Sequence, residues 1–115
     1  MTDTLTIALA QIAQRVGDLA GNADAMLRHR AEVGAVDLIM FPEMQLIGYP
    51  AEDMVEKPAL AARAAAELDG LAKATGDGGA AMIVGTLHRD GDKVYNAVAL
   101  LDGGKISAIR YKHEL

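Results

Sequence analysis

The hydrophobic positions of the first forty residues follow two different periods. Within residues 5–12, Leu5, Ile7 and Leu9 alternate with the small residues at positions 6, 8 and 10, which predicts a strand packed between two layers. Residues 37–41 are apolar almost without a break, which predicts a strand buried on both faces. Between them, residues 23–33 carry apolar side chains at helical spacing, and Asp18 or Asn22 can cap this helix. The order β-α-β favours parallel pairing with a right-handed crossover.

The remaining pattern predicts one more helix and then a run of antiparallel strands. A helix is expected over residues 59–74, with Pro58 in its first turn. Its expected buried face consists of Leu60, Ala64, Leu68, Leu71 and Ala72. Strands over 81–87, 94–101 and 105–112 are separated by short turns that contain glycine. We therefore predict an α/β fold with a mixed sheet, β-α-β-α followed by an antiparallel meander, and no second domain within residues 1–115.

The amino-acid composition argues against several classes of function. Hydrophobic residues make up 51% of the 115 positions, which is ample for a core, and the net charge of −5 includes no basic block. A nucleic-acid or anionic-membrane partner is therefore not expected. The chain has no cysteine, so it offers no disulfide and no thiolate. Neither a basic signal-peptide start nor an apolar run of membrane-spanning length is visible, and we expect a cytoplasmic protein.

Three residues are candidates for chemistry. Glu43 follows Pro42 at the end of the buried strand, which is the edge where open α/β sheets bind their ligands. A carboxylate there either faces solvent, pairs with a lysine or takes part in a reaction, and spacing alone leaves these alternatives open. Lys112, near the end of the last strand, and Tyr49, in a loop before Pro50, are weaker candidates. The three histidines lack the spacing of metal ligands, so no metal site is expected.

Four motifs together give the chain a family resemblance. Phe41-Pro-Glu-Met, Leu46-Ile-Gly-Tyr-Pro-Ala-Glu-Asp, Val94-Tyr-Asn-Ala and Arg110-Tyr-Lys-His-Glu-Leu resemble the nitrilase, or carbon–nitrogen hydrolase, superfamily. The more particular pair, residues 48–54 and 112–115, resembles the N-terminal glutaminase domains of glutamine-dependent NAD synthetases. The resemblance implies a nitrilase-like α-β-β-α sandwich, of which this chain would supply the N-terminal part.

The resemblance also implies roles for the three candidates. Glu43 matches the general base and acid of a Glu–Lys–Cys triad, Lys112 the lysine that stabilises the oxyanion, and Tyr49 a tyrosine of the glutamine pocket. A dehydrated Glu43 would have the raised pKa that such a base needs. The implied reaction is hydrolysis of glutamine to glutamate, with the ammonia used in an ATP-dependent amidation of deamido-NAD. No cofactor is expected in these 115 residues, ATP and Mg²⁺ would belong to a separate synthetase domain, and a homo-oligomer formed by stacked sandwiches is expected.

The missing cysteine is a departure from the family pattern. Without that nucleophile, we expect the 115 residues alone to be inactive, as the front part of a longer protein. One alternative is the N-terminal part of a stand-alone nitrilase-family amidase. Another is a non-catalytic truncated interaction module, in which Glu43 and Lys112 could be exchanged without consequence.

Overall fold

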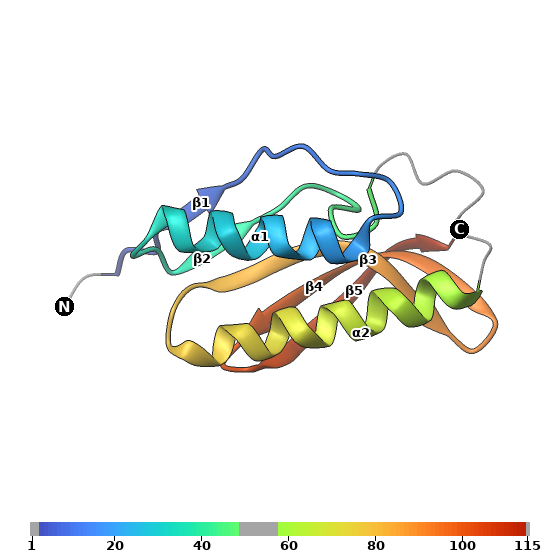
Figure 1. Cartoon of the computed structure of the whole chain (residues 1–115). Helices are drawn as coiled ribbons and strands as arrows, with labels where there is room; N and C mark the ends of the chain where they lie inside the picture. The colour runs from blue at the N-terminus through green and yellow to red at the C-terminus, as the bar shows by residue number, and fades with distance from the viewer. Residues whose placement is uncertain (1–2, 49–57, 115) are drawn as a thin grey trace.

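The computed structural model describes residues 3–48 and 58–114, which form two helices, a short 3₁₀ turn and one five-stranded sheet (Figure 1). In chain order the elements are β1 (Ile7–Leu9), α1 (Leu19–Val33), β2 (Leu38–Met40), α2 (Pro58–Ala74), η2 (Thr75–Asp77), β3 (Ala81–Asp90), β4 (Lys93–Asp102) and β5 (Lys105–Glu114). This order confirms the predicted α/β class and the β-α-β-α start followed by a meander.

The sheet is mixed, and its strands lie in chain order from β1 to β5. β1 pairs with β2, and β2 with β3, in parallel, whereas β3, β4 and β5 pair antiparallel. The strand predicted over residues 5–12 is much shorter than expected and covers Ile7–Leu9 alone. Its last contact with β2 is a hydrogen bond from the Ala10 backbone nitrogen to the Met40 carbonyl, at 2.9 Å. After this point the chain leaves the sheet to reach the start of α1.

The two helices lie side by side over the same face of the sheet (Figure 1). Asp18 caps α1 as predicted, since its carboxylate accepts a hydrogen bond of 3.1 Å from the Gly21 backbone nitrogen. Asn22, the other candidate cap, lies inside the helix instead. All five predicted core positions of α2 are buried. The core therefore lies between this helical layer and the sheet, around Met26, Ile39 and Met82.

The opposite face of the sheet is covered by no element in residues 3–48 and 58–114, and it exposes large apolar side chains. The exposed fraction is 75% for Leu9, 43% for Ile7 and 39% for Val98. Among the described residues, only the small face of β1, with Ala8 and Ala10, packs on the core, so the second layer expected for residues 5–12 stays a prediction. The chain supplies one helical layer and one sheet, which is the N-terminal part of the expected sandwich. Neither described helix is long and apolar enough to cross a membrane.

Candidate active site

A tight turn directly after β2 carries Glu43. Pro42 has no N–H for the sheet, and it follows a bond to β3 in which the Phe41 nitrogen donates to the Ile83 carbonyl at 3.0 Å. The chain then turns over residues 43–47, with Met44 at a left-handed φ of 57°. The Gln45 nitrogen closes the turn onto the Pro42 carbonyl at 3.2 Å. Glu43 therefore sits on a hydrogen-bonded turn at the carboxyl end of a parallel strand, where its sequence position predicted it.

Gly85 of β3 allows this turn to lie against the sheet. A Cβ at position 85 would stand 2.4 Å from the Met44 nitrogen, 2.6 Å from the Pro42 oxygen and 2.9 Å from the Glu43 carbonyl carbon. All three are backbone atoms that no rotamer change can move. The Gly85 carbonyl also accepts a hydrogen bond of 3.1 Å from the Leu46 nitrogen. Only glycine leaves room for such an approach, so Gly85 fixes the place of Glu43 in the fold.

Glu43 and Lys112, two of the three candidates, meet across 69 residues of sequence. The Lys112 Nζ donates to Oε2 of Glu43 at 2.5 Å. The Lys112 side chain is 59% exposed and that of Glu43 is 40% exposed. The dehydrated carboxylate that the sequence led us to expect is therefore not present in the described structure. Tyr49, the third candidate, lies outside the described residues.

Asn96 of β4 is a third member of this cluster, and the sequence analysis assigned it no role. Its side-chain nitrogen Nδ2 donates to the other carboxylate oxygen of Glu43, Oε1, at 2.6 Å. Asn96 is only 4% exposed, which is unusual because asparagine side chains are mostly exposed. The signal available in the sequence was the motif Val94-Tyr-Asn-Ala, which contributed to the family resemblance without any partner for the asparagine.

A β-bulge directs Lys112 toward Glu43. Asn96 is paired with His113, whereas the next residue of β4, Ala97, is paired with Tyr111. Lys112 is thus the extra residue of β5 at this point. In a regular strand, neighbouring side chains point to opposite faces, and the extra residue interrupts this alternation at Lys112. Bulges of this kind re-aim side chains next to functional sites.

These residues line a cleft of about 330 Å³. That size is within the range of about 300–1,000 Å³ that is typical of small-molecule sites. The lining residues are Phe41, Pro42, Glu43, Gly85, Asn96, Ala97, Val98, Arg110, Tyr111 and Lys112. The cleft thus combines mostly apolar walls with one carboxylate, one amide and two cations.

An aromatic stack supports the end of β5. The ring of Tyr111 lies 4.2 Å from that of Tyr95, at an angle of 10°, and 5.4 Å from that of His88. The three rings come from the three antiparallel strands. Stacked rings at such distances stabilise their strands beyond the area they bury. The stack therefore holds the part of β5 that carries Lys112.

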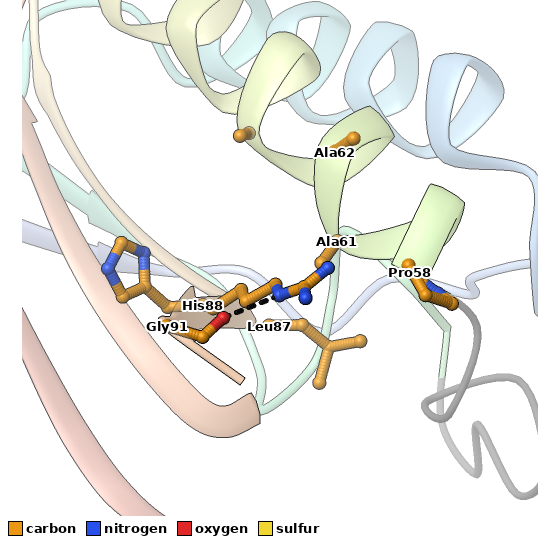
Figure 2. Close-up of a pocket in the computed structure, with 8 residues that line it drawn as sticks. Pro58, Ala61, Ala62, Leu87, His88 and Gly91 are labelled. Carbon is orange, nitrogen blue, oxygen red and sulfur yellow. Dashed lines mark hydrogen bonds between the residues drawn. The ribbon is translucent and has the colours of Figure 1, made fainter. Parts of the chain in front are cut away.

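A second hollow, of about 310 Å³, lies between the start of α2 and the β3–β4 hairpin (Figure 2). Small side chains such as Ala61 and Ala62 line the helical side, and Leu87 and His88 line the other. The Arg89 Nε donates to the Gly91 carbonyl at 2.7 Å, so this cation is bound to its own hairpin. The described residues that line this hollow include no acid. Among the described residues, no group of three or more His, Cys, Asp or Glu side chains could hold a metal ion.

Arg30 and Asp77 form an ion pair that shifts the pKa of both side chains, and this pair lies away from the cleft. Arg30 of α1 binds Asp77 through two hydrogen bonds, of 2.9 and 2.8 Å, and also donates to the Ala80 carbonyl. The Arg30 guanidinium and the Gly79 backbone N–H hold the pKa of the Asp77 carboxyl well below its usual range. The same pairing raises the pKa of Arg30. This pair ties α1 to the loop before β3 and has no part in the site.

Known proteins are similar to this chain in sequence and in fold. Glutamine-dependent NAD(+) synthetases from Rhodobacter capsulatus and Xylella fastidiosa are 40% and 34% identical over 117 and 118 residues, which is 100% of this chain and 21% of each relative. The chain thus spans about a fifth of the length of these relatives. The solved structure of glutamine-dependent NAD+ synthetase from Acinetobacter baumannii, in complex with ADP, has a TM-score of 0.85 at 30% identity, covering 95% of this chain and 21% of that one.

A solved amidase from Nesterenkonia sp. has the same fold, with a TM-score of 0.76 at 24% identity, covering 94% of this chain and 42% of the amidase chain. The family model that describes carbon–nitrogen hydrolases matches residues 6–115. These findings confirm the resemblance that was drawn from the four motifs. The chain belongs to the carbon–nitrogen hydrolase family.

Proposed function

We propose that this chain is the N-terminal part of the glutaminase domain of a glutamine-dependent NAD synthetase. The observation that carries the proposal is the Glu43 carboxylate, which accepts one hydrogen bond from Lys112 and one from Asn96 in a cleft of substrate size. The names of the relatives supply the substrate, glutamine. In this proposal, glutamine is hydrolysed to glutamate, and the released ammonia is used to amidate deamido-NAD.

Glu43 acts as the general base and then as the general acid. It accepts the proton of a nucleophile as that nucleophile attacks the side-chain amide carbon of glutamine, and a tetrahedral oxyanion forms. When the carbon–nitrogen bond breaks, Glu43 returns the proton to the departing ammonia. Water then releases glutamate from the acyl intermediate. The bond to Lys112 favours the ionised form of Glu43, which is the form that a base needs at the start.

Lys112 stabilises the oxyanion of the tetrahedral intermediate. Its ammonium group has three N–H donors, and the bond to Glu43 uses one of them at a time. The remaining donors are available to the oxygen on which negative charge develops, in a cleft whose walls are mostly apolar. We propose that Tyr49 lines the glutamine pocket, since it follows the turn of Glu43 by six residues in sequence.

The nucleophile comes from outside these 115 residues, which contain no cysteine. One solved structure, of a mutant of the Nesterenkonia amidase, shows covalent addition of the acetamide moiety of fluoroacetamide at the active-site cysteine. By analogy, a cysteine from a further part of the domain would face Glu43 and Lys112. The 115-residue chain is therefore expected to be inactive alone. Binding of ATP and Mg²⁺ would belong to a separate synthetase part.

The exposed apolar face of the sheet supports the expected sandwich. Leu9 is 75% exposed, and we propose that this face packs on the second sheet of an α-β-β-α domain. Stacking of such domains would give a homo-oligomer. A stand-alone amidase is the second candidate, because the likeness to the Nesterenkonia amidase covers 94% of this chain.

A segment exchange tests the proposal. Residues 1–115 replace the matching segment of the Rhodobacter capsulatus relative, and NAD formation is measured with glutamine or with added ammonia as the nitrogen source. We expect the hybrid to use both, and we expect Glu43→Gln to abolish the glutamine-driven reaction while the ammonia-driven one continues. Asp24→Asn, which changes an exposed acid of α1, serves as the matched control. A hybrid that uses ammonia normally but never glutamine would contradict the proposal.

A further inference from the structure

We propose that Asn96 is the positioning residue of Glu43: its amide fixes the carboxylate so that the base faces both the cleft and Lys112. This inference rests on the proposed function, since it assigns a role within that reaction. Its structural basis is independent of the relatives, because it follows from the two different donors that hold the two oxygens of Glu43.

The two donors differ in rigidity. Lys112 is 59% exposed and reaches Glu43 through four methylene groups, so its ammonium group can follow the carboxylate to many places. Asn96 is 4% exposed, has a short side chain and belongs to β4, which is paired on both sides. A flexible partner cannot define the orientation of a carboxylate, whereas a short side chain on an interior strand can. The orientation of Glu43 is therefore set by Asn96.

The amide of Asn96 is a suitable donor for Glu43, which acts first as a general base and then as a general acid. An amide N–H donates whether Glu43 is ionised or protonated, so the hydrogen bond to Oε1 persists through the proton transfers. It does so without a second full positive charge, which would weaken Glu43 as a base. The two bonds use two of the about four lone-pair directions of the carboxylate.

The register of the sheet places both donors together. Asn96 is opposite His113, and Lys112 is the extra residue between this pair and the next one. The bulge therefore brings the ammonium group of β5 beside the amide of β4. The other titratable side chains that line the cleft, among the described residues, are Arg110 and Tyr111, both from β5.

Kinetics of the hybrid enzyme test the positioning role. For Asn96→Ala, we expect kcat of the glutamine-driven reaction to fall about 10- to 100-fold, with KM and the ammonia-driven rate nearly unchanged. The acidic limb of the pH profile should move to higher pH, because the lost hydrogen bond favoured the ionised form of Glu43. Asn96→Asp should move it further, since a second carboxylate would then touch the first.

Thr86→Val is the matched control. Thr86 is 1% exposed on β3, and its hydroxyl donates to the Leu87 carbonyl. This variant removes a buried polar group from a neighbouring strand, so it should lower stability without moving the pH limb. A purely structural role for Asn96 would make both variants behave alike.

A measurement on the 115-residue chain separates this inference from the proposed function. The pKa of the Glu43 carboxyl, followed by carbon NMR during a pH titration, should rise in Asn96→Ala and stay in place in Thr86→Val. A Glu43 pKa that is the same with and without Asn96 overturns the inference, whatever the hybrid does. A hybrid without any glutamine-driven reaction overturns the proposed function, and the NMR result still decides the role of Asn96.

Discussion

Gly85→Ala should displace the turn that carries Glu43. The added Cβ would stand 2.4 Å from the Met44 nitrogen, whereas ordinary van der Waals contact begins at 3.4 Å. The turn must therefore retreat by about 1 Å from β3, because all of its nearest atoms belong to the backbone. This retreat lengthens the bond between the Leu46 nitrogen and the Gly85 carbonyl, now 3.1 Å. The strain thus falls on the segment that positions the carboxylate.

The expected cost follows from these two effects. Overpacking of a tight site costs about 1–3 kcal/mol, and a weakened hydrogen bond adds about 0.5–1.5 kcal/mol. We therefore expect Gly85→Ala to lower the free energy of unfolding by about 2–4 kcal/mol. The same shift would take Glu43 from 2.6 Å of the Asn96 amide to beyond hydrogen-bond distance, whereas the flexible Lys112 side chain can follow the carboxylate. In the hybrid enzyme, glutamine-driven activity should fall about 100-fold.

Urea unfolding of the 115-residue chain, followed by far-ultraviolet circular dichroism, measures the first effect. Gly70→Ala is the control, because Gly70 lies in α2 and a Cβ there meets no atom within 4 Å. Alanine favours a helix over glycine, so this variant should be more stable by up to about 1 kcal/mol. If Gly85→Ala unfolds within about 0.5 kcal/mol of the parent chain, the turn does not lie on β3 as described and the reasoning fails.

Three further predictions concern single contacts. Gln45→Met should raise the free energy of unfolding by about 1 kcal/mol, because the fully buried Gln45 amide has no hydrogen-bond partner among residues 3–48 and 58–114; a loss of stability would contradict this. Asp77→Asn should lower the free energy of unfolding near neutral pH, because Arg30 depresses the pKa of Asp77 and stabilises its ionised form in the folded chain. The difference in stability between variant and parent should shrink as the pH falls below 3.8, since protonation of Asp77 removes this stabilisation, and urea midpoints across pH 2–7 would test it. A double-mutant cycle of Glu43→Gln and Lys112→Met should give a coupling below about 1 kcal/mol, since both side chains are well exposed, and a larger value would favour a structural role.

The fold was predictable where the signal is local. The buried face of α2 is correct at every position, because helical spacing is a property of neighbouring residues. The strand over residues 5–12 was predicted too long, because its length depends on a distant partner. The Asn22 side chain bonds Arg15 and the Leu46 carbonyl, and thereby holds the segment after β1 against the turn of Glu43. The hydrophobic pattern of a single segment cannot predict such a contact between distant residues.

The site was predictable only in part for a related reason. Glu43 could be singled out because a proline ends a buried strand just before it, and Lys112 because of its motif. Asn96 could not, since its role depends on the register of β4 and β5 and on the bulge at Lys112. In the sequence, Gly85 is only a glycine within a strand, a position that usually weakens the strand. The reason for this glycine is visible only in the structure, where the turn of Glu43 lies directly against it. Long-range register is the missing information in both cases.

The cluster around Glu43 is better explained by chemistry than by stability. An exposed ion pair contributes only about 0–1 kcal/mol to stability. A hydrophobic residue at position 96 would suit a buried site on an interior strand better than an asparagine does. Three separate features, Gly85, the bulge at Lys112 and the buried Asn96, converge on one carboxylate. Such convergence is typical of a working site, and it favours Glu43 as the base of the proposed reaction.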